Sequence, residues 1–143
     1  MTYGPKAPAL AKQFEGCRLT AYDDGGGTWT LAYGHTRGVQ EGDTCTPEQS
    51  DAWLDQDLTL AASDVSRLID VTLNQNEFDA LVDFVFNLGY GAFENSILRK
   101  LINEGQTLAA AAQFSQWDHI GMTVSAGLLR RRLAERDLFL EAM

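Results

Sequence analysis

The chain has 143 residues and a formal charge of −9, from 11 Lys and Arg residues against 20 Asp and Glu residues. This length suits one compact domain, and 45% apolar with 22% charged residues argues against an intrinsically disordered chain. The acidic balance argues against a nucleic-acid-binding protein and against an anionic membrane surface as the main partner, because both partners are negatively charged.

No apolar run approaches the roughly 20 residues of a membrane-spanning helix, so we expect no membrane span. The N-terminal residues have neither the basic stretch nor the apolar core of a signal peptide, and we expect synthesis in the cytoplasm. Two cysteines, Cys17 and Cys45, are too few for a disulfide framework. Two free thiols fit the expected compartment better than a single disulfide does.

The first part of the chain predicts a helix followed by a glycine-rich hairpin. An apolar pair four residues apart gives the helix one buried face, and a glycine ends it. β-branched and aromatic residues on both sides of a triple glycine indicate two strands joined by a turn. The predicted elements are a helix over about 8–16, strands at 20–22 and 28–33, and a third short strand near Val39.

From Thr46 onward the pattern is helical almost to the end of the chain. Thr46 is a helix cap, Pro47 suits the first helical position, and Gln49 completes a capping box. Gly89 is a natural stop for the helix that precedes it. The predicted helices cover about 47–68, 74–88, 96–105, 107–117 and 126–140.

This element order predicts an α+β fold that is predominantly helical. We expect residues 1–143 to form a single domain, with a small β lobe over about 17–45. The helical body is expected over about 46–143 together with the N-terminal helix. The lobe and the body should meet in a groove, and grooves between lobes are favoured places for ligands.

Glu15, Asp24 and Thr30 are the candidate chemical groups, because a helix end and a hairpin can direct them into one space. Cleavage of a glycosidic bond needs one carboxyl that stays protonated and one that stays ionised. Glu15 follows Phe14 at a helix end, Asp24 lies in a glycine-rich loop, and Thr30 can hold a water molecule. Taken alone, the three residues are explained more simply as a surface charge, a turn former and a strand residue.

The order and spacing of residues 15–35 resemble the signature of the phage-type lysozymes, glycoside hydrolase family 24. In that family the catalytic Glu, Asp and Thr are separated by eight and by five residues, a spacing that matches Glu15, Asp24 and Thr30. The resemblance implies a lysozyme-like fold with a substrate groove between the two lobes. The residues that match the signature are Glu15, Gly16, Leu19, Tyr22, Asp24, Gly27, Thr30, Tyr33, Gly34 and His35.

The resemblance continues in order over segments 86–96 and 117–135, so it covers nearly the whole chain. Two departures stand out. The family's Gly before Tyr-Gly-His is Ala32 here, a small change that a strand should tolerate. The Gly-Lys pair often found after the tryptophan is replaced by Gly121-Met122.

The family reaction is hydrolysis of the β-1,4 bond between N-acetylmuramic acid and N-acetylglucosamine in peptidoglycan. By resemblance, Glu15 is the general acid, and Asp24 and Thr30 position the attacking water. Asp24 also opposes the positive charge of the transition state. This arrangement implies inversion, with the carboxyls about 6.5–9.5 Å apart. The resemblance implies no metal and no organic cofactor.

Three further positions match the substrate-binding machinery of the family. Phe86 and Ser96 correspond to residues that line the sugar groove, and Arg130 corresponds to an arginine that pairs with Glu15 or Asp24. Other interpretations stay open, namely core packing for Phe86, helix capping for Ser96 and a solvated cation for Arg130. His35 is interpreted as a structural histidine.

The partner implied by the resemblance is peptidoglycan, with a holin releasing a monomeric enzyme from the host cytoplasm to the periplasmic wall. Alternatives are a lysozyme module of a phage tail or secreted effector, a lytic transglycosylase, and a non-catalytic peptidoglycan-binding domain. The presence of Glu15, Asp24 and Thr30 together argues against a non-catalytic binding domain. A charge of −9 gives no general attraction to an anionic wall, so binding must depend on local contacts.

Overall fold

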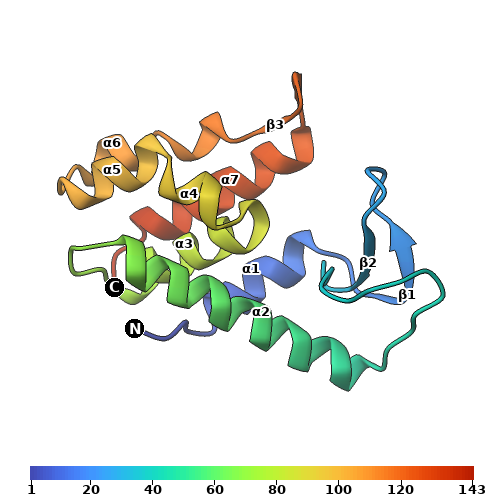
Figure 1. Cartoon of the computed structure of the whole chain (residues 1–143). Coiled ribbons are helices and arrows are strands. Elements are labelled where there is room, and N and C mark those ends of the chain that lie inside the picture. The colour runs from blue at the N-terminus through green and yellow to red at the C-terminus, as the bar shows by residue number, and fades with distance from the viewer.

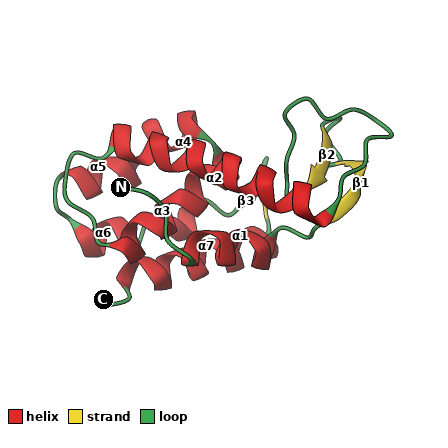
Figure 2. Cartoon of the chain, turned by 90° about the horizontal axis from the view of Figure 1, so that it is seen from below, coloured by secondary structure: helices red, strands yellow, loops and turns green.

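The computed structural model describes all 143 residues and has an α+β fold that is mostly helical. Figure 1 shows a helical body with a small β lobe at one end, and α2 runs from the lobe into the body. Figure 2 shows the same separation from below. The elements are α1 (Lys6–Phe14), β1 (Arg18–Asp23), β2 (Trp29–Ala32), α2 (Pro47–Leu68), α3 (Gln75–Leu88), α4 (Tyr90–Glu94), α5 (Ile97–Asn103), α6 (Thr107–Ala111), the short 3₁₀ helix η1 (Phe114–Gln116), β3 (His119–Ile120), β4 (Thr123–Val124) and α7 (Ala126–Leu140).

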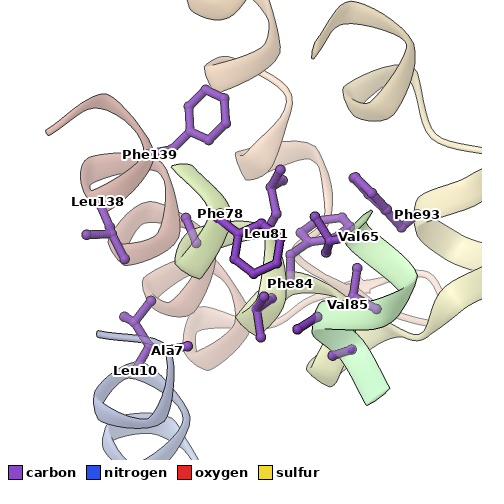
Figure 3. Packing of buried hydrophobic residues seen from close by; sticks show 14 of the residues in the cluster. Ala7, Leu10, Val65, Phe78, Leu81, Phe84, Val85, Phe93, Leu138 and Phe139 are labelled. Atoms are coloured by element: carbon purple, nitrogen blue, oxygen red, sulfur yellow. The ribbon is translucent and has the colours of Figure 1, made fainter. Parts of the chain in front are cut away.

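Helix α3 is the centre of the body, because α1, α2 and α7 all pack against it. Figure 3 shows its apolar side chains meeting residues of α1, α2, α4 and α7 in one core. The ring of Phe84 makes edge contacts with Phe93, Phe114 and Trp117, at centroid distances of 5.9, 5.8 and 5.7 Å. Such aromatic pairs each add about 0.5–1.5 kcal/mol beyond the burial of their area.

Local sequence chemistry fixes where the central helices begin. Thr46 and Gln49 form the predicted capping box of α2, and Asn74 and Glu77 form a second capping box on α3. Each box satisfies backbone N–H groups that have no partner inside the helix. Gly89 ends α3 with a φ of 95°, a backbone conformation that glycine adopts without strain.

Helix α1 is tied to α3 by one buried carboxylate. Asp79 accepts hydrogen bonds from the backbone N–H groups of Gly4 and Ala7, at 2.8 and 3.2 Å. Ala7, together with Leu10 and Ala11, buries one face of α1 in the core. The C-terminal end of α1, and with it Glu15, therefore has a fixed place relative to α3.

The β lobe is the predicted antiparallel hairpin. Its register pairs Tyr22 with Thr30, and Gly25 and Gly27 turn the chain with φ values of 95° and 85°. The third strand predicted near Val39 is wrong. That stretch is formed by turns, because Gly38 and its neighbours curl the backbone instead of extending it.

The six predicted helices are present in the predicted order, with shifts at several ends, and the short helix α4 was not predicted. The helix predicted over 107–117 ends at Ala111 and gives way to η1, and α1 ends at Phe14 before the predicted stop. The hairpin of β3 and β4 was not predicted, because strands of two residues show no alternating pattern. No helix in the structure combines the length and apolar character needed to cross a membrane.

Ala32 is the last residue of β2, but its backbone does not have the extended conformation in which we expected it to be tolerated. Its φ is 57°, and it is the single non-glycine residue with a positive φ. This left-handed region places Cβ close to the following carbonyl, which costs roughly 1–2 kcal/mol for an L-residue. The alanine methyl group is completely buried, so its packing offsets part of that strain.

Candidate active site

Glu15 caps the C-terminal end of α1, where its backbone N–H donates to Ala11 O at 2.8 Å. Its side chain is 23% exposed and lies against Gly34 of the loop after β2. A Cβ atom on Gly34 would lie 3.0 Å from Glu15 Oε2, and the φ of Gly34 is 74°. Glycine is therefore needed at position 34 for its backbone conformation and to leave room for the carboxylate.

A buried arginine holds the Glu15 carboxylate. Arg131 Nη1 donates to Glu15 Oε1 at 2.9 Å, and Arg131 Nε and Nη2 donate to the two oxygens of Asp83 at 2.9 and 2.8 Å. These hydrogen bonds fix the orientation of the guanidinium plane and the position of its charge. The carboxylates beside Arg131 more than offset the effect of its burial and raise its pKa further above the ordinary arginine value.

Asp83 and Glu135 form a buried acidic pair behind Arg131. Burial opposes the ionisation of Asp83, but hydrogen bonds with Glu135 and Arg131 outweigh it and lower the pKa of Asp83. Complete burial raises the pKa of Glu135 well above its usual range, and the hydrogen bond and charge of Asp83 act in the same direction. The buried Arg132, whose Nε lies 2.7 Å from Glu135 Oε1, opposes this rise, whereas Asp83 is the member of the pair that binds Arg131.

The structure corrects the predicted pairing of Arg130. The arginine that reaches Glu15 is Arg131, whereas Arg130 is exposed and forms no ion pair. One residue along a helix turns the side chain by about 100°, so adjacent arginines face different surroundings. Arg130 lies off the buried face of α7, which is formed by Arg131, Arg132, Glu135, Leu138 and Phe139.

Asp24 lies at the exposed end of the hairpin. Its Oδ1 accepts from the N–H groups of Gly26 and Thr28, at 2.8 and 3.2 Å, while its Oδ2 has no partner in the protein. Asp23 makes the equivalent turn contacts with the N–H groups of Gly25 and Gly27. The turn-former interpretation therefore holds for Asp24, and it leaves one carboxylate oxygen free.

Thr30 is buried on β2, opposite Tyr22, and its hydroxyl donates to Thr28 O at 3.3 Å. Burial raises the pKa of Tyr22, and the charges of Glu15 and Asp24 act in the same direction. The charge of Arg18 lowers this pKa. Tyr22 is thus within electrostatic reach of both candidate carboxylates.

Two hollows lie on the faces next to Glu15. The larger is a cavity of about 830 Å³ between the end of α1 and the start of α7, and the smaller one, of about 290 Å³, is lined by Gly34 and Phe86. Asp24 and Thr30 line neither of them. The residues that line the larger cavity include Glu15, Ile120, Leu128, Arg130, Arg131 and Asp137.

The remaining predicted site residues differ in their surroundings. Phe86 lines the smaller hollow, and its ring centre is 5.9 Å from the guanidinium carbon of Arg131. Ser96 is buried and lines neither hollow, since its hydroxyl donates to Phe93 O and accepts from Arg99 N–H at the start of α5. The structure thus supports the capping interpretation of Ser96.

His35 is a structural histidine, as interpreted from the sequence. Its ring stacks on Trp53 at a centroid distance of 4.9 Å, and its Nδ1 lies 2.8 Å from Asp57 Oδ2. Cys17 and Cys45 are free thiols. Both sulfur atoms contact the hydroxyl of Ser50, at 3.6 and 3.3 Å. No group of three His, Cys, Asp or Glu side chains is arranged to hold a metal ion.

Comparisons with known proteins bear on the family and the fold of this chain. Residues 12–135 match the family model described as phage lysozyme. The chain is 40% identical over 143 residues to the endolysin of Acyrthosiphon pisum secondary endosymbiont phage 1, covering 97% of this chain and 98% of that protein. It is also 40% identical over 134 residues to the endolysin of Salmonella phage P22, covering 90% and 91%. Among solved structures, the muramidase domain of SpmX from Asticaccaulis excentricus has a TM-score of 0.91 and 38% identity, with 99% of each chain covered.

Proposed function

Because the chain belongs to the phage lysozyme family and is a peptidoglycan hydrolase, we propose that Glu15 is the general acid of its glycosidase reaction. The bond cut is the β-1,4 bond between N-acetylmuramic acid and N-acetylglucosamine. The observation that carries this proposal is the position of Glu15, which borders the large cavity and is held from behind by Arg131. A fixed carboxyl at the wall of a cavity can deliver a proton to a leaving oxygen with little reorganisation.

Asp24 has a different proposed role. Its free oxygen lies on an exposed residue, and its carboxylate opposes the positive charge that develops on the sugar ring. Thr30 and Asp24 together position the water that attacks the opposite face of the ring. In this proposal the product has the inverted configuration at the anomeric carbon, which proton NMR of the fresh products would report.

The test of the proposal is digestion of purified peptidoglycan by the wild type and by Glu15→Gln, with the products analysed by mass spectrometry. Loss of a general acid lowers the rate by about 10²–10⁴-fold. We expect reducing muropeptides from the wild type and almost none from Glu15→Gln. Glu104→Gln is the matched control, because Glu104 is an exposed glutamate that lines neither hollow, and it should retain full activity.

Two other results would contradict the proposal. Anhydro-muropeptides from the wild type would identify a lytic transglycosylase, a reaction in which Thr30 has no water to hold. Equal activity in Glu15→Gln and the wild type would remove Glu15 from the chemistry.

The wider biological setting also belongs to this proposal. We propose that the 143 residues act as one monomeric catalytic domain, made in the host cytoplasm and released to the periplasmic wall through a holin. Relatives named endolysins support this setting. Gel filtration with light scattering tests the monomer, and lysis timing with and without a co-expressed holin tests the release step.

A further inference from the structure

The tip of the β lobe contains the one position in the chain where glycine follows aspartate. Of the 13 glycines, only Gly25 comes directly after Asp, and none comes directly after Asn. In an Asp-Gly pair the backbone nitrogen of the glycine can attack the side-chain carbonyl carbon of the aspartate and close a succinimide ring. Glycine permits this close approach because it has no side chain. The aspartate of this pair is Asp24, one of the proposed catalytic residues.

The fold leaves the Asp24–Gly25 bond unprotected. Residues 23–28 are all exposed, and neither Asp24 nor Gly25 lines one of the two hollows beside Glu15. A Cβ atom on Gly25 would meet no atom within 4 Å outside the adjoining residues. No other part of the protein therefore packs against the reacting atoms, and water has free access to them.

Asp23 is placed to accept the proton that must leave the attacking nitrogen. Its Oδ1 accepts a hydrogen bond from the N–H group of Gly25 at 2.8 Å. The same oxygen accepts from the N–H group of Gly27 at 3.1 Å, which holds the carboxylate in position. A backbone amide becomes a good nucleophile only when its proton is removed, so a carboxylate fixed on that proton can act as a general base. An Asp-Gly pair in an unfolded chain lacks this fixed base.

The carboxyl group of Asp24 is held in a way that favours addition of the nitrogen. Its Oδ1 accepts from the N–H groups of Gly26 and Thr28, at 2.8 and 3.2 Å. Two N–H donors on one oxygen stabilise the negative charge that this oxygen gains when a nucleophile adds to the carbon. Oδ2 has no partner in the protein and is free to leave. The turn thus supplies a base, two donors for the developing charge and an unhindered leaving oxygen.

We propose that the turn promotes the spontaneous conversion of Asp24 to isoaspartate, and that this conversion inactivates the enzyme. In the reacting form, Oδ2 of Asp24 carries a proton. The nitrogen of Gly25 gives its proton to Asp23 and forms a bond with Cγ of Asp24, while an electron pair moves to Oδ1. Oδ2 then leaves as water with its own proton and the proton that Asp23 returns, and Oδ1 becomes a carbonyl oxygen again.

Hydrolysis of the succinimide restores the lost water at one of two carbon atoms. Attack at Cγ regenerates Asp24, whereas attack at the former main-chain carbonyl carbon breaks its bond to the nitrogen of Gly25 and gives isoaspartate. The product has an unchanged mass, a longer main chain and a carboxylate attached directly to Cα. Loss of activity rests on the proposed function, in which the carboxylate of Asp24 opposes the charge on the sugar ring.

The experiment follows the purified wild-type protein during incubation at neutral pH in water labelled with heavy oxygen. Trypsin cuts after Arg18 and Arg37, so the Asp-Gly pair is recovered in the peptide of residues 19–37. Electron-transfer mass spectrometry distinguishes isoaspartate from aspartate in this peptide, and one heavy oxygen atom at residue 24 reports passage through the succinimide. Peptidoglycan hydrolysis is measured on the same samples. The wild type unfolded in guanidinium chloride is incubated in parallel.

We expect isoaspartate and heavy oxygen at residue 24, formed faster in the folded protein than in the unfolded chain. Asp23→Asn keeps an acceptor for the Gly25 N–H group but is not a base. It should slow the reaction of the folded protein by about 10²-fold, the lower end of the contribution of a positioned general base. Asp24→Glu is the blocked control and should form no product, because its longer side chain would have to close a larger ring.

The hydrolytic activity of the wild type should fall in proportion to the isoaspartate fraction, while Asp23→Asn keeps its activity over the same period. A folded protein that stays unmodified while the unfolded chain reacts would overturn the inference, since the turn would then protect the pair. Equal rates in Asp23→Asn and the wild type would overturn the role of the turn. Isoaspartate without loss of activity would overturn the inactivation and the proposed role of Asp24. A fresh wild type that does not hydrolyse peptidoglycan would refute the proposed function, whereas isoaspartate formation is measured independently of it.

Discussion

The two candidate carboxylates occupy opposite kinds of environment. Glu15 is backed by a buried ionic cluster that joins α1, α3 and α7, whereas Asp24 lies in an exposed glycine turn held by its own backbone contacts. Acid catalysis and charge stabilisation need unlike surroundings for two chemically similar groups. The fold supplies the difference by placing one carboxyl on the body and the other on a separate lobe, as Figure 1 shows for α1 and the hairpin.

In the ionic cluster behind Glu15, substitution of Asp83 should cause the largest loss of stability. Asp83→Asn leaves the guanidinium of Arg131 buried with one ionic partner fewer, and removing one member of a buried pair destabilises by about 3–5 kcal/mol. Urea unfolding measures this loss. Asp51→Asn is the control, because Asp51 pairs with Lys12 on the surface at 3.1 Å and should change stability by less than about 1 kcal/mol. Similar losses in the two variants would contradict a structural role for the cluster.

In the β lobe, the role of the Asp24 charge can be tested without disturbing the turn. Asn keeps the Oδ1 acceptor that binds Gly26 and Thr28, so Asp24→Asn should fold normally while the charge is lost. We expect kcat to fall about 10²–10³-fold, the usual effect of removing one electrostatic stabiliser of a transition state. Asp23→Asn is the matched control, because Asp23 makes the same kind of turn contacts and should retain activity. A large loss in Asp23→Asn would assign the effect to the turn instead.

The buried acidic pair predicts two opposite trends of stability with pH. The raised pKa of Glu135 means that the folded state binds the extra proton, so stability should rise as the pH falls toward about 4.3, the unfolded value of Glu. The lowered pKa of Asp83 contributes stability that is complete above about 3.9 and lost as the pH falls further through the folded value. The largest possible slope for each group is about 1.4 kcal/mol per pH unit.

Glu135→Gln separates the two trends, because glutamine imitates the protonated form and keeps a donor for Asp83. We expect the variant to lose the rise between neutral pH and about 4.3 while keeping the fall below about 3.9. Thermal unfolding recorded from pH 3 to pH 7 measures both. A wild-type curve without the upper trend would show that Glu135 is ionised in the folded protein.

The parts of this molecule that the sequence predicts well are those decided by nearest neighbours. The cap at Thr46 and the stop at Gly89 depend only on side chains within one helical turn of each site. The choice between Arg130 and Arg131 depends on the phase of α7 against α3, which no local rule defines for three consecutive arginines. The strand near Val39 was wrongly predicted because the conformation of the adjoining glycines decided the backbone path.

The smallest expected effect is that of substituting Ala32, which ends β2 of the lobe. In an ordinary strand, replacing a buried alanine by glycine costs about 0.5–1 kcal/mol in backbone entropy and about 0.8 kcal/mol for the methyl group. At a φ of 57°, relief of roughly 1–2 kcal/mol of strain offsets those losses. We therefore expect Ala32→Gly to change the free energy of unfolding by no more than about 0.5 kcal/mol.

Ala7→Gly is the control, because Ala7 is equally buried but lies in helix α1, and it should lose about 1–2 kcal/mol. Equal losses at the two positions would mean that residue 32 is not strained, and that the alanine in place of the family's glycine has no energetic consequence.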